Sequence, residues 1–349
     1  MLRAVAKHSA ALAKAVVDSG ALDALVVCLE EFDPSVKEAA AWALSYIAKH
    51  SAELAQAVVD VGAVPLLVLC IQEPEIALKR ISASALSEIC KHSAELAQAV
   101  MDAGAVPFLS TLIPHPDTQL KRQVCSCLAN ISKHAVELAE NVVEQEIFPK
   151  ILYRLKDTDP QVKKYAATCI REIAKQSPDL AKLICNAGGV VAIVDYINET
   201  KGNTRLPGII TLGYIAAFDE SLAMSVIAAK GISPLKDALI REPDDLIKAA
   251  AAWSLGQIGG HSADHARAMA EADVPSHLLA VYKFPESSED LKKKAKKALK
   301  SVLQMCSHLP ALEPLISEAP PDILQYVLHQ FAKTLPNDNA AKKYFSLFS

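Results

Sequence analysis

A short string recurs at a fixed interval along this chain and limits the folds that are open to it. The tetrapeptides that begin at Lys7, Lys49 and Lys91 all read Lys-His-Ser-Ala, and a related tetrapeptide begins at Lys133. Each begins 42 residues after the one before it. A period of this size is typical of arrays in which each unit buries its apolar face against its neighbours. The sequence therefore predicts a stack of similar units.

The turn residues within one unit predict three helices. Ser51 can cap a short first helix that ends before Gly62, where glycine permits a left-handed turn. A second helix is expected from about Val64 to Ile71, and Pro74 then begins a longer third helix that runs through Ile89. Three helices in a 42-residue unit are typical of armadillo repeats, whereas HEAT repeats usually have two. We therefore predict an all-α, right-handed superhelical solenoid of armadillo repeats.

The same period sets the expected domain boundaries. Residues 1–7 align with the end of a third helix, residues 8–307 contain seven repeats, and residues 308–349 read as a degenerate or truncated repeat. Residues 337–348 resemble a first helix that stops early. Neither end has the polar capping helix of a finished solenoid. We expect a fragment or a shortened isoform whose ends can self-associate.

The turn glycines keep this period with two departures. Glu146 stands where a glycine is expected, and Gly231 is displaced by one residue; the regular glycines are Gly20, Gly62, Gly104 and Gly188.

Composition and charge narrow the classes of partner. Hydrophobic residues make up 51% of the chain and aromatic residues only 5%, which favours closely packed helices. The net charge of -4 argues against nucleic acid. No apolar run reaches the roughly 20 residues that span a bilayer, and residues 1–14 lack a secretory signal. We expect a soluble intracellular protein without a membrane partner, with its cysteines as reduced thiols.

No motif in the sequence predicts catalysis, a cofactor or a metal ion. The chain has no phosphate-binding loop and no nucleophile elbow. The recurring histidines would lie roughly 10 Å apart in stacked repeats, too far to share an ion. His261 and His265 are four residues apart, but no glutamate completes a zinc motif. We expect a protein that is not an enzyme.

Two rows of side chains are expected along the third helices, which line the concave groove of armadillo solenoids. Nuclear-import adaptors hold repeated Trp and Asn in these rows and clamp basic peptides, whereas this chain keeps only part of that ladder. We therefore expect a groove for some other segment. In the first six repeats, the first slot holds Trp42, Ser84, Ser126, Thr168, Ile210 and Trp253, and the second slot, one turn later, holds Tyr46, Glu88, Asn130, Glu172, Tyr214 and Gln257.

A third row is basic in six of the repeats. Lysine at an exposed helix start is ordinary, so a solvated surface is one interpretation. The other is a basic stripe that meets an acidic partner, such as the surface of a microtubule, and the lysines from Lys292 to Lys300 would extend it. The stripe comprises Lys37, Lys79, Arg80, Lys121, Arg122, Lys163, Lys164, Arg205 and Lys248.

Several longer segments resemble one family of armadillo proteins. They are residues 32–44, 63–80, 201–208, 247–253 and 309–315, of which Lys-Gly-Asn-Thr-Arg-Leu-Pro-Gly at 201–208 is the most distinctive. They resemble the paralysed-flagella family, the armadillo-repeat proteins of the ciliary central apparatus. The resemblance implies a non-enzymatic scaffold of the axoneme that binds the central-pair microtubule and neighbouring proteins and is required for flagellar or ciliary motility. Members of that family extend beyond both ends of this sequence.

Three functions stay open at this point. The leading hypothesis is the central-apparatus scaffold, with copies of the chain itself among its expected partners. The alternative is a cytosolic adaptor that binds extended peptide segments in its groove. A regulatory subunit of an enzyme is a more distant third.

Overall fold

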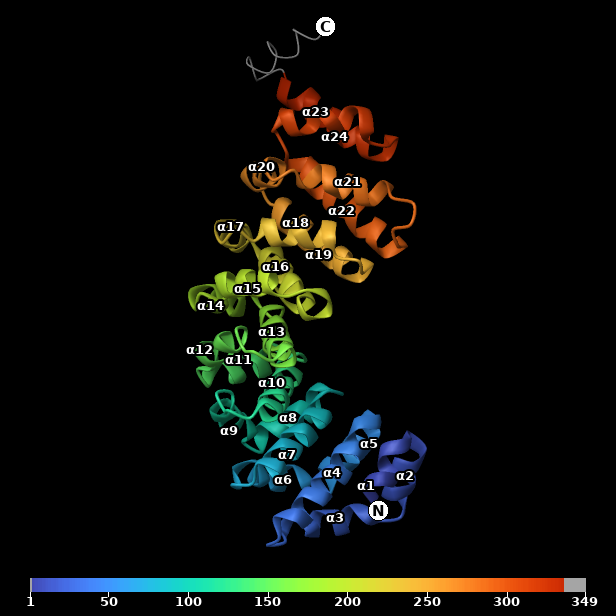
Figure 1. Cartoon of the computed structure of the whole chain (residues 1–349), viewed down its shortest axis with the longest axis vertical. Helices are drawn as coiled ribbons and strands as arrows, with labels where there is room; N and C mark the ends of the chain where they lie inside the picture. The colour runs from blue at the N-terminus through green and yellow to red at the C-terminus, as the bar shows by residue number, and fades with distance from the viewer. Residues whose placement is uncertain (1, 336–349) are drawn as a thin grey trace. The chain divides into compact units, whose positions relative to one another are not determined.

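The regular elements in the described part of the chain, residues 2–335, are all helices in the computed structural model. The chain divides into two units, Met1–Leu180 and Ala181–Ser349. Within each unit a short helix, a medium helix and a long helix follow one another, as Figure 1 shows from blue to green and from yellow to red. This is the three-helix repeat that the sequence predicts.

The helices from the N-terminus to Ala174 form four triplets after a short leading helix. They are α1 (Leu2–His8), α2 (Ala10–Asp18), α3 (Ala21–Glu30), α4 (Pro34–His50), α5 (Ala52–Asp60), α6 (Ala63–Gln72), α7 (Ile76–Cys90), α8 (Ala94–Asp102), α9 (Ala105–Leu112), α10 (Thr118–Ser132), α11 (Val136–Glu144), α12 (Ile147–Arg154) and α13 (Pro160–Ala174).

The remaining helices form three further triplets and a final pair. They are α14 (Pro178–Asn186), α15 (Gly189–Glu199), the 3-10 turn η1 (Gly202–Thr204), α16 (Leu206–Phe218), α17 (Glu220–Ala228), α18 (Ile232–Arg241), α19 (Asp245–Gly259), α20 (Ala263–Glu271), α21 (Val274–Lys283), α22 (Glu289–Met305), α23 (Leu309–Glu318) and α24 (Pro321–Thr334). The first helix predicted within 337–348 lies outside the described residues.

Side-chain caps explain where most of the first helices begin; α11 and α20 have none. The Ser51 hydroxyl accepts a hydrogen bond from the Leu54 amide at 3.2 Å, and Ser93 caps α8 in the same way. The prediction that Pro74 begins the third helix is wrong by two residues. Glu75 precedes α7 in an extended conformation, which leaves Pro74 in the bend between helices.

The left-handed turn recurs in each of the seven three-helix repeats, but one turn residue was assigned wrongly. Gly62 has φ +77°, and Glu146 takes the same conformation at φ +52° although it is not glycine. In the sixth repeat Lys230 makes the left-handed turn at φ +63°, in step with the 42-residue period, and Gly231 is right-handed. Gly231 serves close packing instead, because a Cβ there would lie 2.6 Å from Cγ1 of Val226.

The third helices form the centre of each stack. In the first unit α4 packs on α7, α7 on α10 and α10 on α13; in the second unit α16 packs on α19 and α19 on α22. Their inward side chains, including Leu44, Leu86 and Leu128, are fully buried. Burying such side chains is the main term that stabilises a stack of this kind. The helices are therefore held in register, and their outward residues form regular rows.

The cysteines of the chain are free thiols, six of them buried. Cys127 and Cys169, which occupy equivalent positions, are both completely buried. Within residues 2–335 no single helix is long and apolar enough to cross a membrane, and two bent pairs, α5 with α6 and α14 with α15, reach that length only when taken together.

Candidate functional site

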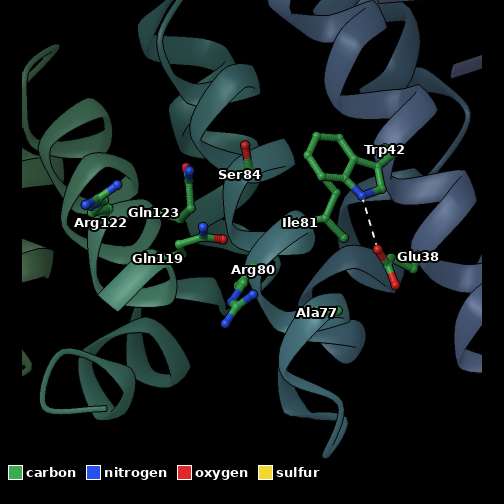
Figure 2. A pocket seen from close by; sticks show the side chains of 9 residues that line it. All are labelled: Glu38, Trp42, Ala77, Arg80, Ile81, Ser84, Gln119, Arg122 and Gln123. Carbon is green, nitrogen blue, oxygen red and sulfur yellow. Dashed lines mark hydrogen bonds between the residues drawn. The ribbon is translucent and has the colours of Figure 1, made fainter. Parts of the chain in front are cut away.

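The third helices of the first three repeats line a groove, which we call the Trp42 groove. It has a volume of about 320 Å³ and lies across α4, α7 and α10 (Figure 2). The first-slot residues Trp42 and Ser84 both line it. The other side chains that give the groove its chemistry are Glu38, Arg80, Gln119, Arg122 and Gln123.

Three neighbours fix the Trp42 ring at one end of the groove. Its Nε1 donates a hydrogen bond to Oε1 of Glu38 at 3.2 Å, the dashed line of Figure 2. The ring stacks on Tyr46 with 5.5 Å between centroids, and the Arg3 guanidinium lies 4.1 Å from the ring centroid. A cation over an indole face is a favourable contact. Trp42 is thus a half-buried, oriented aromatic surface.

Arg80 and Arg122 bring two predicted stripe residues into the same groove. Nε of Arg80 donates to Oδ1 of Asp117 at 2.8 Å, and Nε of Arg122 donates to Oδ1 of Asp159 at 2.9 Å. Each arginine makes a second bond from Nη2 to the same carboxylate. This forked geometry holds the guanidinium planes in place. The first-slot row and part of the basic row therefore belong to one surface.

The two aspartates have a second role at the starts of the following third helices. Oδ1 of Asp117 accepts from the Leu120 amide at 2.7 Å, so the carboxylate also caps α10. The hydrogen bond from Arg80 lowers the pKa of Asp117 and raises that of Arg80 itself. One carboxylate thus joins a basic side chain of one repeat to the helix start of the next repeat.

Other members of the basic row point into the stack. Lys121 is 7% exposed, and its Nζ lies 2.5 Å from Oδ2 of Asp157. Burial raises the pKa of Asp157, but the bonds from Lys121 and from the backbone outweigh it and leave that pKa below its usual value. Arg205 is 4% exposed and bonds to Glu242 at 3.1 Å. The expectation of an exposed stripe is wrong for these two residues.

Three further lysines of the predicted basic stripe form hydrogen bonds or ion pairs within the chain. Nζ of Lys37 lies 2.7 Å from Oε1 of Glu73, and this hydrogen bond raises the lysine pKa. Nζ of Lys79 donates to the Ile71 carbonyl at 2.9 Å, and Lys248 lies 3.7 Å from Asp245. Lys163 and Lys164 are half-buried.

Most of the second-slot side chains form hydrogen bonds, ion pairs or ring contacts with other side chains of the chain. Nδ2 of Asn130 donates to Oγ of Ser87 at 3.0 Å, which ties α10 to α7. Glu172 is 6% exposed and pairs with Arg171 and Lys175, so it lies too deep to line a groove, contrary to the prediction. Glu88 pairs with Lys91, and Tyr214 meets Trp253 edge to face at 5.2 Å.

The recurring histidines join the ends of successive third helices. Nε2 of His92 donates to the Ala48 carbonyl at 2.7 Å, and His134 makes the same bond to Cys90. Gln176 replaces the histidine in the next repeat and donates to Ser132 at 2.7 Å. Burial lowers the pKa of both His92 and His134. These residues satisfy carbonyls that a helix end leaves without partners.

His261 and His265 have hydrogen-bond partners of the same kind. Nε2 of His261 lies 2.6 Å from the Ala216 carbonyl, and Nε2 of the fully buried His265 lies 3.0 Å from the Glu220 carbonyl. No group of three or more possible metal ligands occurs within residues 2–335.

One residue of the first-slot row was missed. Trp42 follows the N-cap Asp33 by nine residues, and Trp253 follows the N-cap Asp244 by nine. Lys297 follows the N-cap Ser288 of α22 by the same interval. It occupies the first slot of the seventh repeat, and counting from the capping serine would have found it. The loop before Ser288 had obscured this spacing.

The armadillo/beta-catenin-like repeat family matches residues 9–49, 51–91 and 93–133, and the HEAT repeat family matches residues 147–177. The second match spans α12 and α13, the two longer helices of a repeat that also contains α11. An engineered protein of known structure superposes with a TM-score of 0.86 at 25% identity, over 98% of this chain and 85% of that one. This chain therefore has the all-α fold of an armadillo-repeat solenoid.

The particular relatives agree with the resemblance found in the sequence. Sperm-associated antigen 6 of Mus musculus is 62% identical over 111 residues, and that of Homo sapiens is 63% identical over 111 residues. Each alignment covers 32% of this chain and 22% of the relative, a narrower span than the motifs suggested. A designed armadillo repeat protein in complex with the peptide (KR)4 has the same fold, with a TM-score of 0.65 at 19% identity over 68% of this chain and 99% of that chain.

Proposed function

We propose that this chain is a non-enzymatic scaffold of the axonemal central apparatus in motile cilia and flagella, required for their beating. The observation that carries the proposal is its identity of 62–63% with sperm-associated antigen 6 over 111 residues, together with its armadillo repeats. Its partners in this role are the central-pair microtubule, neighbouring central-apparatus proteins and further copies of the chain.

The Trp42 groove is the surface that we assign to a partner. Its aromatic ring and two arginines are fixed by contacts within the chain, so binding a partner costs little ordering of these side chains. Fixed aromatic and arginine side chains are the types that most often dominate binding energy. The stripe hypothesis is retained here only for Arg80 and Arg122, which face the groove.

Localisation tests the cellular role. Fluorescently tagged protein is expected along the axoneme of motile cilia, and its loss should stop or weaken beating. Diffuse signal with normal motility would instead favour the alternative, a cytosolic adaptor that uses the same groove for extended peptide segments.

Substitution in the groove tests the surface itself. Trp42→Ala removes the oriented ring and should reduce capture of axonemal partners several-fold. Phe32→Ala is the matched control, because Phe32 is 99% exposed in the same unit and does not line the groove. Equal capture by both variants would show that the groove does not bind these partners, and that a scaffold role would depend on other surfaces of the chain.

A further inference from the structure

The exposed face of α22 carries lysines that are not paired with carboxylates. The buried side chains of the helix, among them Leu291, Leu299 and Val302, face the stack. Lys293, Lys297 and Lys300 lie at helical spacing on the opposite side and are all exposed. The three ammonium groups thus form one continuous surface, which we call the α22 lysine face.

The neighbouring lysines of α22 differ in having acidic partners. Nζ of Lys294 lies 2.8 Å from Oδ2 of Asp290, and Nζ of Lys296 lies 2.6 Å from Oδ2 of Asp322. Lys300 lies over the Tyr326 ring, with 5.5 Å between Nζ and the ring centroid. Among residues 2–335, no carboxylate lies within 4.0 Å of the α22 lysine face.

The spacing of acidic residues along the sequence explains the difference. Arg122 meets an aspartate 37 residues further along, and Lys121 meets one 36 residues further along. The residues at these two intervals from Lys293 are His329 and Gln330, and those from Lys297 are Lys333 and Thr334. Lys293 is the equivalent of Arg122, and the residue 37 positions after it is Gln330 instead of an aspartate; the carboxylate that the final pair of helices supplies, Asp322, pairs with Lys296.

An aromatic ring lies beside this face. Trp253 of α19 lines a shallow hollow together with Gln257, Lys294 and Lys297. Helices α19 and α22 pack closely there, because a Cβ on Gly256 would lie 2.8 Å from Cα of Ala298. Lys297 occupies the first slot that Trp253 occupies in the preceding repeat, so the two side chains continue one row.

The spacing of the lysines fits an extended chain. Lys293 and Lys297 are about 6 Å apart along the helix axis, and alternate residues of an extended polypeptide are separated by nearly 7 Å. Two acidic side chains at alternate positions of an extended segment laid along α22 therefore match Lys293 and Lys297, and Lys300 follows about 4.5 Å further along the axis. The Trp253 ring packs edge to face with Tyr214, with 5.2 Å between the ring centroids, which holds the indole in one orientation beside the lysines.

We infer that the α22 lysine face, with Trp253 at its edge, binds an extended polypeptide segment rich in glutamate or aspartate. The inference rests on charge complementarity and does not depend on the central-apparatus role. Trp253 can report it directly, because the chain has only two tryptophans and Trp42→Phe leaves Trp253 as the single emitter.

The test is a titration of the full chain with a fluorescein-labelled peptide of eight glutamates at low salt. The triple variant Lys293→Glu, Lys297→Glu, Lys300→Glu is expected to weaken binding about tenfold or more. The control Lys7→Glu, Lys49→Glu, Lys201→Glu makes the same change in net charge at exposed positions elsewhere and should change the affinity less than about twofold. Peptide binding should also shift the Trp253 emission of the Trp42→Phe protein.

Three results would overturn the inference. The first is no binding of the octaglutamate peptide, and the second is an equal loss of affinity in both triple variants. The third is tighter binding to an eight-nucleotide thymidine strand or to phosphatidylserine vesicles than to the peptide. Circular dichroism of each variant checks that it remains folded. None of these results bears on localisation, so failure here and failure of the proposed function are separate outcomes.

Discussion

The basic residues at the start of α10 and those on the exposed face of α22 have the same charge but different surroundings. Lys121 and Arg122 each bind a carboxylate of the next repeat, at Asp157 and Asp159. Lys293 and Lys297 have no such partner in the described part of the chain. The comparison teaches that acids of the following repeat neutralise the basic residues at the start of α10, whereas Lys293 and Lys297 keep their charge for a partner.

The largest expected effect is on the buried pair of the first unit. Lys121→Ala leaves the buried Asp157 carboxylate with Arg154, 3.2 Å away, as its remaining basic partner, and should lower the free energy of unfolding by about 2 kcal/mol. The control Lys297→Ala removes an exposed lysine and should cost less than about 0.5 kcal/mol. Urea unfolding followed by circular dichroism measures both, and equal losses would contradict the comparison.

A smaller effect on the free energy of unfolding distinguishes the capping role of Asp159 from its ion pair with Arg122. Asp159→Ala removes both the bond from Arg122 and the cap on the Val162 amide, and should cost about 2 kcal/mol. Asp159→Asn keeps a capping oxygen and loses only the charge, so we expect about 1 kcal/mol or less for this half-exposed pair. If the asparagine variant is as unstable as the alanine variant, the ion pair contributes more than the cap.

The smallest effect is a dependence of stability on pH that arises from two histidines of the first unit, His92 and His134. Burial lowers the pKa of His92 and His134 in the folded chain, so the unfolded chain takes up protons first on acidification. Stability should therefore fall slightly as the pH drops below about 6.5.

Replacement of both histidines by glutamine gives the control for this effect. Gln176 already makes the equivalent bond to a helix end, so the double variant should fold and should show a flatter dependence on pH. Urea midpoints at pH 8 and pH 5.5 make the measurement. An unchanged slope in the double variant would assign the effect to other groups.

Much of the fold could be predicted because the 42-residue period is visible in the sequence. Cap residues such as Ser51 and Ser93 set helix starts, and the apolar spacing set the buried faces. The turn at Lys230 was missed because glycine is the usual residue there, whereas in this repeat Gly231 is needed for contact with Val226. In this repeat the close packing of Gly231 against Val226 therefore outweighs the usual preference for glycine at the left-handed position.

The site was less predictable than the fold. The first-slot position of Trp42 followed from the repeat alignment, but the sequence alone did not show that Arg80 and Arg122 share its groove. The burial of Glu172 and Lys121 also depends on neighbouring repeats. Ion pairs between residues that are 36 or 37 positions apart can be found in the sequence only when each basic residue is compared with the acidic residues of the next repeat.

The division of the basic residues into structural and binding groups can be measured in one experiment. Limited acetylation of lysines, read by mass spectrometry with and without the octaglutamate peptide, follows Lys121 and the α22 lysine face together. We predict slow labelling of Lys121 under both conditions, and rapid labelling of Lys293, Lys297 and Lys300 that the peptide suppresses. Rapid labelling of Lys121, or no protection of the α22 lysine face by the peptide, would contradict the account.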